Sequence, residues 1–298
     1  MKAMDDILAA AKAGGRKRIA VAAAQESSAL EAALDARAAG IAEPILIGDL
    51  AAIRAIAAEI GADLEGIRMI EEKDNAGAAA KAVALDRSGE ANILMKGVLD
   101  TSILLKAALN KESGLNAGRL TSHVAVIEST HYHKLFIVTD GAINIAPDLQ
   151  GKLDIIANAV QVSKSLGVAR PKVALLAAVE KVNPEKMPCT ADAAVITQMQ
   201  RRNQVKECIV DGPLALDNAI SAESARIKNI VSEVAGDADI LVTPDIEAGN
   251  ILYKALVDLG GAKAAAIVAG TAKPIVLTSR SDSRETKLAS IALASLTG

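Results

Sequence analysis

Short apolar runs alternate with longer helical patterns along most of the chain. The runs are rich in Val, Ile and Leu, and most lack polar alternation, which is typical of parallel strands covered on both faces. The Ala-rich stretches between them have the spacing of helices. The pattern predicts strands over 18–24, 44–49, 66–71, 92–97, 124–129, 135–140, 172–179, 207–212, 239–244, 264–270 and 274–279, and helices over 27–39, 50–60, 75–87, 101–110, 148–166, 190–202, 248–259 and 283–296.

This alternation predicts an α/β fold with mostly parallel, doubly wound sheets and helices on both faces. One pair of strands departs from it, because only a short segment containing HYHK separates 124–129 from 135–140. We expect an antiparallel hairpin there. Gly, Pro and Asn gather in DGAINIAPDLQGK, so a domain change is expected near residues 140–150.

The composition sets the size of the protein and limits its partners. A chain of 298 residues with 51% hydrophobic content is long enough for two domains of ordinary size. The formal net charge is -3, which gives no basic surplus for nucleic acid. Aromatic residues make up only 1% of the chain, so few side chains are able to stack on nucleic-acid bases. We therefore expect no nucleic-acid partner.

Cysteines and apolar segments bear on the compartment. Cys189 and Cys208 cannot form a disulfide framework, which indicates a reducing environment. The N-terminal segment MKAMDDILAAAKAGG lacks the apolar core of a secretory signal. The most apolar later stretch, 264–278, is broken by Lys273-Pro274 and is too short to span a bilayer. These features predict a cytoplasmic protein with no membrane partner.

Polar residues that follow strands are the candidates for chemistry, because ligands of open α/β sheets bind beyond the carboxyl ends of the strands. The segment TSRSDS, 278–283, follows a strand and opens a helix. Hydroxyls, a fixed cation and N–H groups at a helix N-terminus suit an oxyanion or a phosphate. Capping by Asp282 or Ser283 accounts for the acid and the hydroxyls, but it does not account for Arg280 at the positive end of the helix dipole.

A second candidate is KGVLDTSILLKAAL. Asp100 or Thr101 is placed to cap the helix, Lys106 falls in its second turn, and Lys96 ends the preceding strand. Either lysine is able to hold a phosphate as a point charge. For Lys106 taken alone, a solvated side chain on a helix face is the preferred interpretation.

A third candidate is DILVTPDIEAGNILYK, in which an apolar strand stops at Pro244 and two acids flank Ile246. Pro244 and Gly249 are typical of a turn. Asp245 and Glu247 suit general acid–base catalysis. They also suit the cap and the dipole of a helix N-terminus, and this is the preferred interpretation of either acid alone.

The sequence lacks the common nucleotide and hydrolase motifs, namely the P-loop, G-x-G-x-x-G after the first strand, and G-x-S-x-G. His131 and His133 with Glu128 have a spacing that permits a metal, but an exposed hairpin is preferred. Cys189 lies near a helix start, where a thiolate is favoured, yet no histidine partner is identifiable nearby. We interpret Cys189 as structural. We also expect no metal site at the histidines.

Several of these strings resemble one family. VAGDADILVTPDIEAGNILYKAL, GTAKPIVLTSRSDS and KLASIALAS are similar to the C-terminal half of the phosphate acetyl/butyryltransferase family. MKGVLDTSILLKAALN and GRLTSHVAVIE resemble its N-terminal signatures, and the wording of SRSDS and KGVLDTS is similar to the butyryltransferase branch. The resemblance runs from residue 15 to the end, although the N-terminal residues up to about 90 match mainly in pattern.

The resemblance implies the reaction acyl-CoA + phosphate ⇌ acyl phosphate + CoA, with a butyryl or an acetyl group. Coenzyme A is then a substrate and product, no cofactor is tightly bound, and a homodimer is expected. The implied fold has two α/β domains, similar to isocitrate and isopropylmalate dehydrogenases. The first would combine 1–140 with 276–298 and the second would comprise 141–275, with the active-site cleft between them.

The resemblance also implies roles for residues. Ser279 and Arg280 match the family's Ser-Arg pair: Arg280 would bind phosphate or polarise the acyl carbonyl, and Ser279 would donate to the developing oxyanion. Ser122 matches a family active-site serine. Lys106 falls, with a small shift, where acetyl-transferring members carry an arginine. Thr101, Asn250 and Ser283 complete the expected substrate-binding set.

The general base stays open. Acetyl-transferring members carry an Asp, proposed as the base for the CoA thiol, where this chain has Thr286. Asp282 and Glu247 are the remaining candidates. Because a free thiol has a pKa of about 8.5, a weak base is sufficient. We expect direct attack in a ternary complex.

Two other functions remain open. One is a dehydrogenase on the same architecture, acting on a hydroxy acid or a phosphorylated substrate with a metal and a nicotinamide. For it the chain offers no obvious paired-Asp site apart from Asp237 and Asp239 in a predicted turn. The other is a non-catalytic module that binds CoA or acyl phosphate. Acyl chain length and physiological direction cannot be deduced from the sequence.

Overall fold

The computed structural model describes residues 1–279 and 282–298, and the chain divides into two compact units. The unit that we call the terminal unit comprises Met4–Arg119 and Ala265–Gly298. The central unit comprises Met1–Ala3 and Leu120–Ala264. The domains expected from the sequence, 1–140 with 276–298 and 141–275, stay a prediction.

The terminal unit contains a mostly parallel sheet. Its strands are β1 (Lys17–Ala22), β2 (Ala42–Gly48), β3 (Arg68–Glu71), β4 (Ile93–Lys96), β10 (Lys263–Ala269, in this unit from Ala265) and β11 (Ile275–Val276). They lie in the order β3-β2-β1-β4-β11-β10. The pairs from β3 to β11 are parallel, whereas β10 and β11 are antiparallel.

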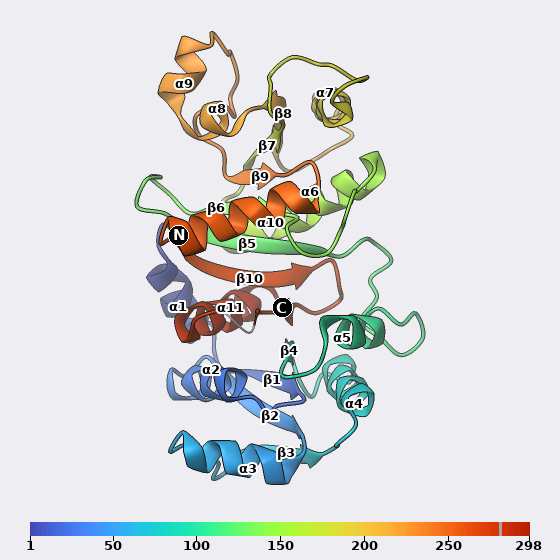
Figure 1. Ribbon diagram of the computed structural model, residues 1–298, viewed down its shortest axis with the longest axis vertical. Helices are drawn as coiled ribbons and strands as arrows, with labels where there is room; N and C mark the ends of the chain where they lie inside the picture. Colours follow the sequence, from blue (N-terminus) through green and yellow to red (C-terminus); the bar gives the residue numbers. More distant parts are fainter. Residues whose placement is uncertain (280–281) are drawn as a thin grey trace. The chain divides into compact units, whose positions relative to one another are not determined.

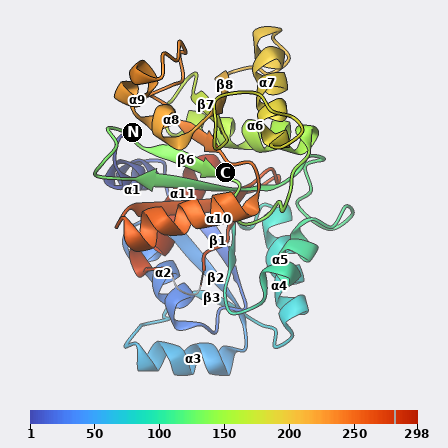
Figure 2. The same cartoon turned by 45° about the horizontal axis from the view of Figure 1, so that its top comes forward.

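Helices cover both faces of this sheet. One layer contains α1 (Met4–Ala13), α2 (Ser27–Ala38), α3 (Leu50–Glu59) and α11 (Arg284–Thr297), and α11 packs on both α1 and α2 (Figure 1). The other layer contains α4 (Asn75–Arg87) and α5 (Thr101–Ala108), which pack on each other (Figure 2). Most buried residues of α2 and several of α4 are alanines, whose small side chains let these helices lie close to the sheet.

The central unit has its own strand order, β5-β6-β9-β7-β8. β5 (Ser122–Glu128) and β6 (Phe136–Thr139) form the antiparallel hairpin that the sequence predicts. β6 then pairs in parallel with β9, β9 with β7 and β7 with β8. The bounds are β7 (Lys172–Leu176), β8 (Ile209–Leu214) and β9 (Ile240–Val242).

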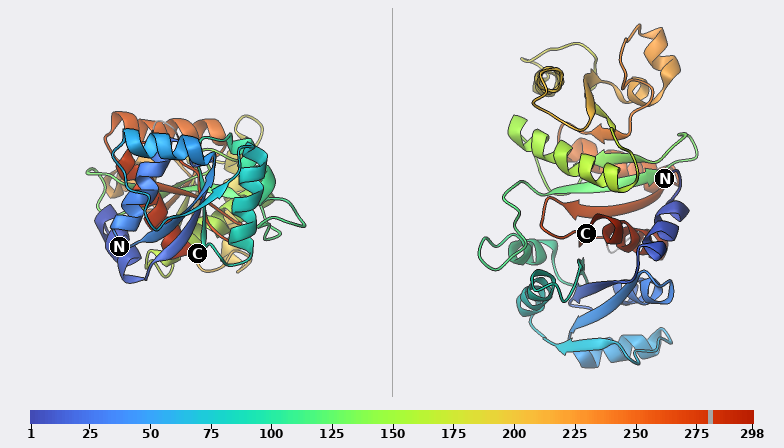
Figure 3. Two further views of the ribbon diagram at one scale, coloured as in Figure 1. Left: turned by 90° about the horizontal axis from the view of Figure 1, so that it is seen from below. Right: turned by 180° about the vertical axis from the view of Figure 1, so that it is seen from behind.

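Helices also cover both faces of the central sheet. α6 (Leu149–Ser165) packs on β5, β6 and β9, and α7 (Pro188–Arg201) packs on β8. α10 (Ile246–Lys254) continues as a π-helical turn, Ala255–Leu259, and lies on the face opposite α6 (Figures 1 and 3). The short helices α8 (Leu216–Ile220) and α9 (Ala222–Ile227) pack on each other.

The predicted α/β class is confirmed, and each predicted strand range overlaps an observed strand. Three helices were not predicted: α1, α8 and α9. The last two are only 5 and 6 residues long, which is too short for a helical period to show. In the described part of the chain, no helix has the length and apolar content needed to cross a membrane.

One acid is buried in the terminal unit without a hydrogen-bond partner. Asp86, on α4, is 1% exposed, and neither of its carboxylate oxygens accepts a hydrogen bond. Burial raises the pKa of Asp86 to about 7, although Lys273 lowers it in part. The protonated acid is therefore favoured in the folded state up to neutral pH.

We expect Asp86→Asn to reduce the pH dependence of folding stability. The pKa of this carboxyl is about 4 in the unfolded chain, below its folded value, so its contribution to stability is full below about pH 4 and is lost as the pH rises to about 7. Between pH 4 and pH 8, the wild type should lose about 2–4 kcal/mol more of its free energy of unfolding than D86N, measured by chemical denaturation. Glu59→Gln, at an exposed position on α3, is the control. Parallel curves for D86N and the wild type contradict the prediction.

Candidate active-site segments

In the terminal unit, the described residues between β11 and α11 form local hydrogen bonds. Ser283 is the N-cap of α11, and its Oγ accepts from the Thr286 amide at 3.1 Å. The Asp282 carboxylate accepts from the Ser279 amide at 2.6 Å, and the Asp282 amide donates to the Ser279 carbonyl at 3.2 Å. The structure thus brings Ser279, Asp282 and Ser283 together. Arg280 lies outside the described residues.

These bonds limit what each group is free to do. Ser279 and Ser283 are exposed, but the Ser283 hydroxyl already serves the helix cap that the sequence suggested. Asp282 is half-buried, and its carboxylate helps to fold the segment. Thr286 is 9% exposed, so the position of the acetyl-type base holds a buried hydroxyl.

A lysine that sequence reasoning missed lies beside this segment. Lys287 is 2% exposed, and its Nζ donates to the Asp282 carbonyl at 2.8 Å. By contrast Arg284, one turn earlier, is exposed and forms ion pairs with Asp35 and Glu31, which raise the pKa of the Arg284 guanidinium. The sequence of α11 carries no signal for this, and only the structure shows that the helix is buried almost all round from Thr286 to Ser295.

The second candidate segment leads into α5. Asp100 takes the N-cap position, but its side chain makes no capping hydrogen bond, and Thr101 is the first helical residue. Lys96 is 8% exposed, and its Nζ donates to the carbonyls of Gly97 and Leu99 at 3.1 and 3.4 Å. Lys96 therefore stabilises the loop before the helix.

Lys106 is exposed on α5, and it lines a cavity of about 760 Å³ between α4 and α5. Most of the lining side chains are small and apolar, and Arg87 adds a second cation. Arg87 is itself engaged, because its guanidinium donates to the Glu112 carbonyl at 2.6 Å. Lys106 is thus accessible to an anion.

In the central unit, the segment after β9 divides its two acids between different tasks. The Asp245 carboxylate accepts from the Ala248 amide at 2.9 Å as the N-cap of α10, which confirms the capping interpretation for this residue. Glu247, in the first turn, is exposed and forms no hydrogen bond or ion pair with the residues that the structure describes. Only Glu247 is available to a substrate.

Gly249 permits a close approach between α10 and the end of β6. A Cβ atom at this position would lie 2.3 Å from the Asp140 carbonyl and 2.7 Å from the Thr243 Oγ1. Asn250 adds a hydrogen bond from its Nδ2 to the Gly141 carbonyl at 3.0 Å. The predicted substrate-binding amide of Asn250 is therefore engaged in holding this junction.

Asp140 stabilises the same junction from the other side. It is 3% exposed, and its carboxylate accepts from the amides of Ala142, Ile143 and Asn144 at 2.9, 3.0 and 3.2 Å. The Asn144 side chain donates to it at 2.6 Å. A carboxylate surrounded by N–H donors stays buried without a cation.

Ser122 is at the start of β5 and is 0% exposed. Its Oγ accepts from the Asn158 Nδ2 at 3.0 Å, and the same amide donates to the Leu120 carbonyl at 2.9 Å. A hydroxyl in this place acts on a substrate only through its neighbours.

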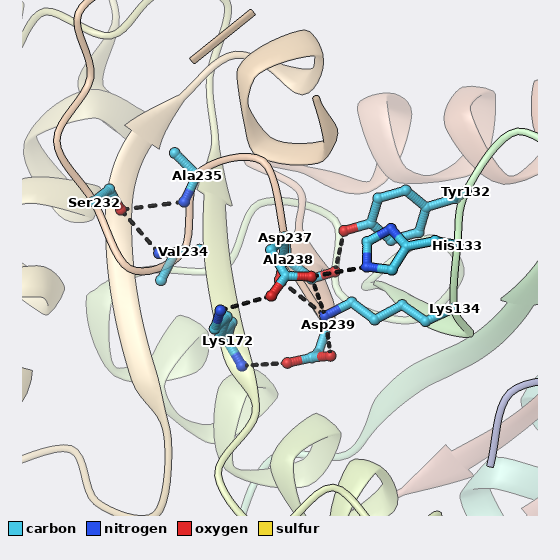
Figure 4. Close-up of polar contacts among 10 residues, drawn as sticks. All are labelled: Tyr132, His133, Lys134, Lys172, Ser232, Val234, Ala235, Asp237, Ala238 and Asp239. Carbon is cyan, nitrogen blue, oxygen red and sulfur yellow. Dashed lines mark hydrogen bonds and ion pairs between the residues drawn. The ribbon is translucent and has the colours of Figure 1, made fainter. Parts of the chain in front are cut away.

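The acids that a metal-dependent dehydrogenase would need are paired with cations. Asp237 accepts from Lys172 at 2.6 Å and forms an ion pair with Lys134, which also contacts Asp239 at 2.6 Å (Figure 4). Burial raises the pKa of Asp237, but the bonds from Lys172 and Lys134 outweigh it and hold this pKa well below the usual range. His133 contacts Asp237 at 3.0 Å, so it belongs to the same cluster.

The structure contains no group of three or more His, Cys, Asp or Glu side chains placed to hold a metal ion, among residues 1–279 and 282–298. Cys189 lies in the first turn of α7, and burial raises the pKa of its thiol. The thiol form is therefore favoured, in agreement with a structural role.

Comparisons with known proteins point to one family. The family model for phosphate acetyl/butaryl transferase matches residues 2–80 and 72–295. The phosphate butyryltransferase of Clostridium acetobutylicum is 47% identical over 296 residues, 99% of this chain and 98% of that protein. The phosphate acetyltransferase of Thermotoga maritima is 44% identical over 284 residues, 95% and 96% of the two chains. A solved branched-chain phosphotransacylase from Enterococcus faecalis has a TM-score of 0.81 at 36% identity, covering 94% of this chain and 98% of that one.

We expect Gly249→Ala to destabilise the central unit, although alanine is the better helix former. The added methyl would overlap the Asp140 carbonyl, so the free energy of unfolding should fall by about 1–3 kcal/mol in chemical denaturation. Gly77→Ala on α4 is the matched control, because the atoms nearest to its methyl would be those at the end of the Glu72 side chain and not backbone atoms. G77A should be neutral or stabilising by up to about 1 kcal/mol. Similar effects of the two substitutions contradict the importance of the close approach.

Proposed function

The chain belongs to the phosphate acetyl/butaryl transferase family, and we propose that it moves a short-chain acyl group, butyryl or acetyl, between coenzyme A and inorganic phosphate. It is an acyltransferase, as its named relatives are. The observation that carries the proposal is the match along nearly the whole chain, which includes the sequence TSRSDS that precedes α11.

The proposed chemistry is one direct transfer in a ternary complex. A phosphate oxygen attacks the carbonyl carbon of the thioester, the new C–O bond forms, and the C–S bond breaks. The electron pair of that bond leaves on the CoA sulfur, which takes up a proton or departs as thiolate. In the reverse direction a base removes the thiol proton, and the thiolate attacks the acyl phosphate.

Two anionic substrates must approach each other, so fixed positive charge is the main requirement. We assign this task to Arg280, which would hold the phosphate or polarise the carbonyl. The exposed Ser279 hydroxyl would donate to the oxyanion, and the N–H groups of the first turn of α11 add their partial charge. Orientation of the two substrates supplies the rest.

For the base we propose Glu247 ahead of Asp282. Glu247 is exposed and has no partner in the described part of the chain, whereas the Asp282 carboxylate already holds the Ser279 amide. Among the substrate-binding residues, Lys106 with Thr101 is proposed to contact the anionic groups. The other three predicted substrate-binding residues contribute indirectly, by fixing the backbone segments around the substrate: Asn250, Ser122 and Ser283.

The alternatives are less well supported. The acids Asp237 and Asp239, which a metal-dependent dehydrogenase would need, are bound to lysines. A non-catalytic module that only binds CoA or acyl phosphate would not turn over. The two-domain architecture of isocitrate and isopropylmalate dehydrogenases, the homodimer, the cytoplasmic location and the absence of a tightly bound cofactor stay proposals that rest on the sequence and its resemblance.

We expect Arg280→Ala to lower turnover by at least about a hundredfold, because the variant loses a charge that stabilises the transition state. The measurement is thiol release from butyryl-CoA and acetyl-CoA on addition of phosphate. Arg284→Ala is the control, since that guanidinium is already paired with Asp35 and Glu31. If R280A is as active as R284A, the assignment of Arg280 is wrong. If the wild type releases no thiol, the proposed function is wrong.

A comparison of Glu247→Gln with Asp245→Ala separates catalysis from capping. E247Q should lower kcat about a hundredfold or more and leave the melting temperature unchanged, because the Glu247 side chain is exposed and forms no hydrogen bond or ion pair with the described residues. D245A should cost about 1 kcal/mol of stability through the lost N-cap. Unchanged turnover in E247Q would leave Asp282 as the candidate base.

A further inference from the structure

Lys287 has the least ordinary environment of the charged residues near TSRSDS. Its side chain is 2% exposed, although lysine is rarely buried without a counter-ion. Its Nζ donates to the Asp282 carbonyl at 2.8 Å, and no carboxylate of the described residues forms an ion pair with it. A buried ammonium with one neutral acceptor is costly to the folded state.

The position of Lys287 on α11 increases this cost. Lys287 is the fourth residue of the helix, and helical side chains lean toward the N-terminus, so Nζ reaches the Asp282 carbonyl just before the first turn. The helix dipole is positive at this end and repels a cation. A capping carboxylate would offset the repulsion, but the N-cap here is the neutral Ser283.

The Asp282 carboxylate does not neutralise the lysine. It accepts from the Ser279 amide, and no ion pair joins it to Lys287. Arg284 is different, because it lies in solvent and has the carboxylates of Asp35 and Glu31. Of these two cations on the first turns of α11, only the buried one lacks a protein counter-ion in the described chain.

We propose that Lys287 is a positioning residue of the phosphate site and supplies a buried positive charge that inorganic phosphate compensates on binding. The inference rests on the proposed function, and it concerns the phosphate substrate rather than CoA. Lys287 touches protein only: it fixes the Asp282 carbonyl and adds its charge to that of the helix terminus next to Asp282 and Ser283. The protein loses stability without the anion and gains affinity for it.

Lys287→Met tests the proposal, because methionine is similar in length and carries no charge. In thiol-release kinetics, K287M should raise the KM for phosphate by roughly tenfold or more and leave the KM for acyl-CoA nearly unchanged. Without phosphate, its melting temperature should equal or exceed that of the wild type. Inorganic phosphate should raise the melting temperature of the wild type and raise that of K287M much less.

Two further variants complete the design. Lys287→Arg keeps the charge and should retain most of the stabilisation by phosphate, so it also covers the case in which K287M does not fold. Arg284→Met removes an exposed, paired cation from the same helix and should leave the KM for phosphate unchanged.

A merely structural lysine would give the opposite result: K287M would melt lower, and phosphate would shift it as far as it shifts the wild type. That outcome overturns the inference, as does an effect on the KM for acyl-CoA alone. An active wild type with an unchanged KM for phosphate in K287M refutes only the role of Lys287. A wild type that releases no thiol refutes the proposed function, and the thermal shift with phosphate still decides the role of Lys287.

Discussion

The structure depends on strands that are covered by helices on both faces. Residues 93–95 of β4 and 124–127 of β5 are fully buried, so both sides of these strands carry only apolar side chains at these positions. Polar chemistry is therefore confined to the strand ends, where loops start and helices begin. This holds separately in each unit. In the terminal unit the ends of β4 and β11 carry the candidates, and in the central unit the ends of β6 and β9 carry them.

At these ends most polar side chains form hydrogen bonds to the backbone, so they are not free to bind a substrate. Ser283 and Asp245 cap helices, Asp140 binds amides, and Asn250 holds a carbonyl. A segment without regular structure needs such bonds, because its N–H and C=O groups have no ladder partners. The chemical groups left over are few, and in the described segments Glu247 is the clearest of them. The local hydrogen bonds thus fix the geometry that a reaction would use.

The α/β class and the strands were predictable because burial on both faces leaves continuous apolar runs in the sequence. The hairpin of β5 and β6 was predictable from the shortness of its connection. α8 and α9 were not, because helices of that length show no period. Burial of polar side chains was also beyond prediction. Nothing in the local helix or strand pattern distinguishes Lys287, Asp86 or Ser122 from exposed polar residues. They are removed from water only by the packing of other elements against them.

The motif PDIEAGN shows why a family signature does not assign chemistry to each of its residues. Asp245 caps α10, Gly249 admits the Asp140 carbonyl at a distance no side chain would allow, and Asn250 ties the helix to Gly141. The fold alone explains each of these three residues. Glu247 is not, since an exposed acid in the first turn adds only a small dipole term to stability. A catalytic role is therefore best sought in the residue that contributes least to the fold. The same reasoning identifies Lys287, because its burial costs stability and its only hydrogen bond in the described residues is to the Asp282 carbonyl.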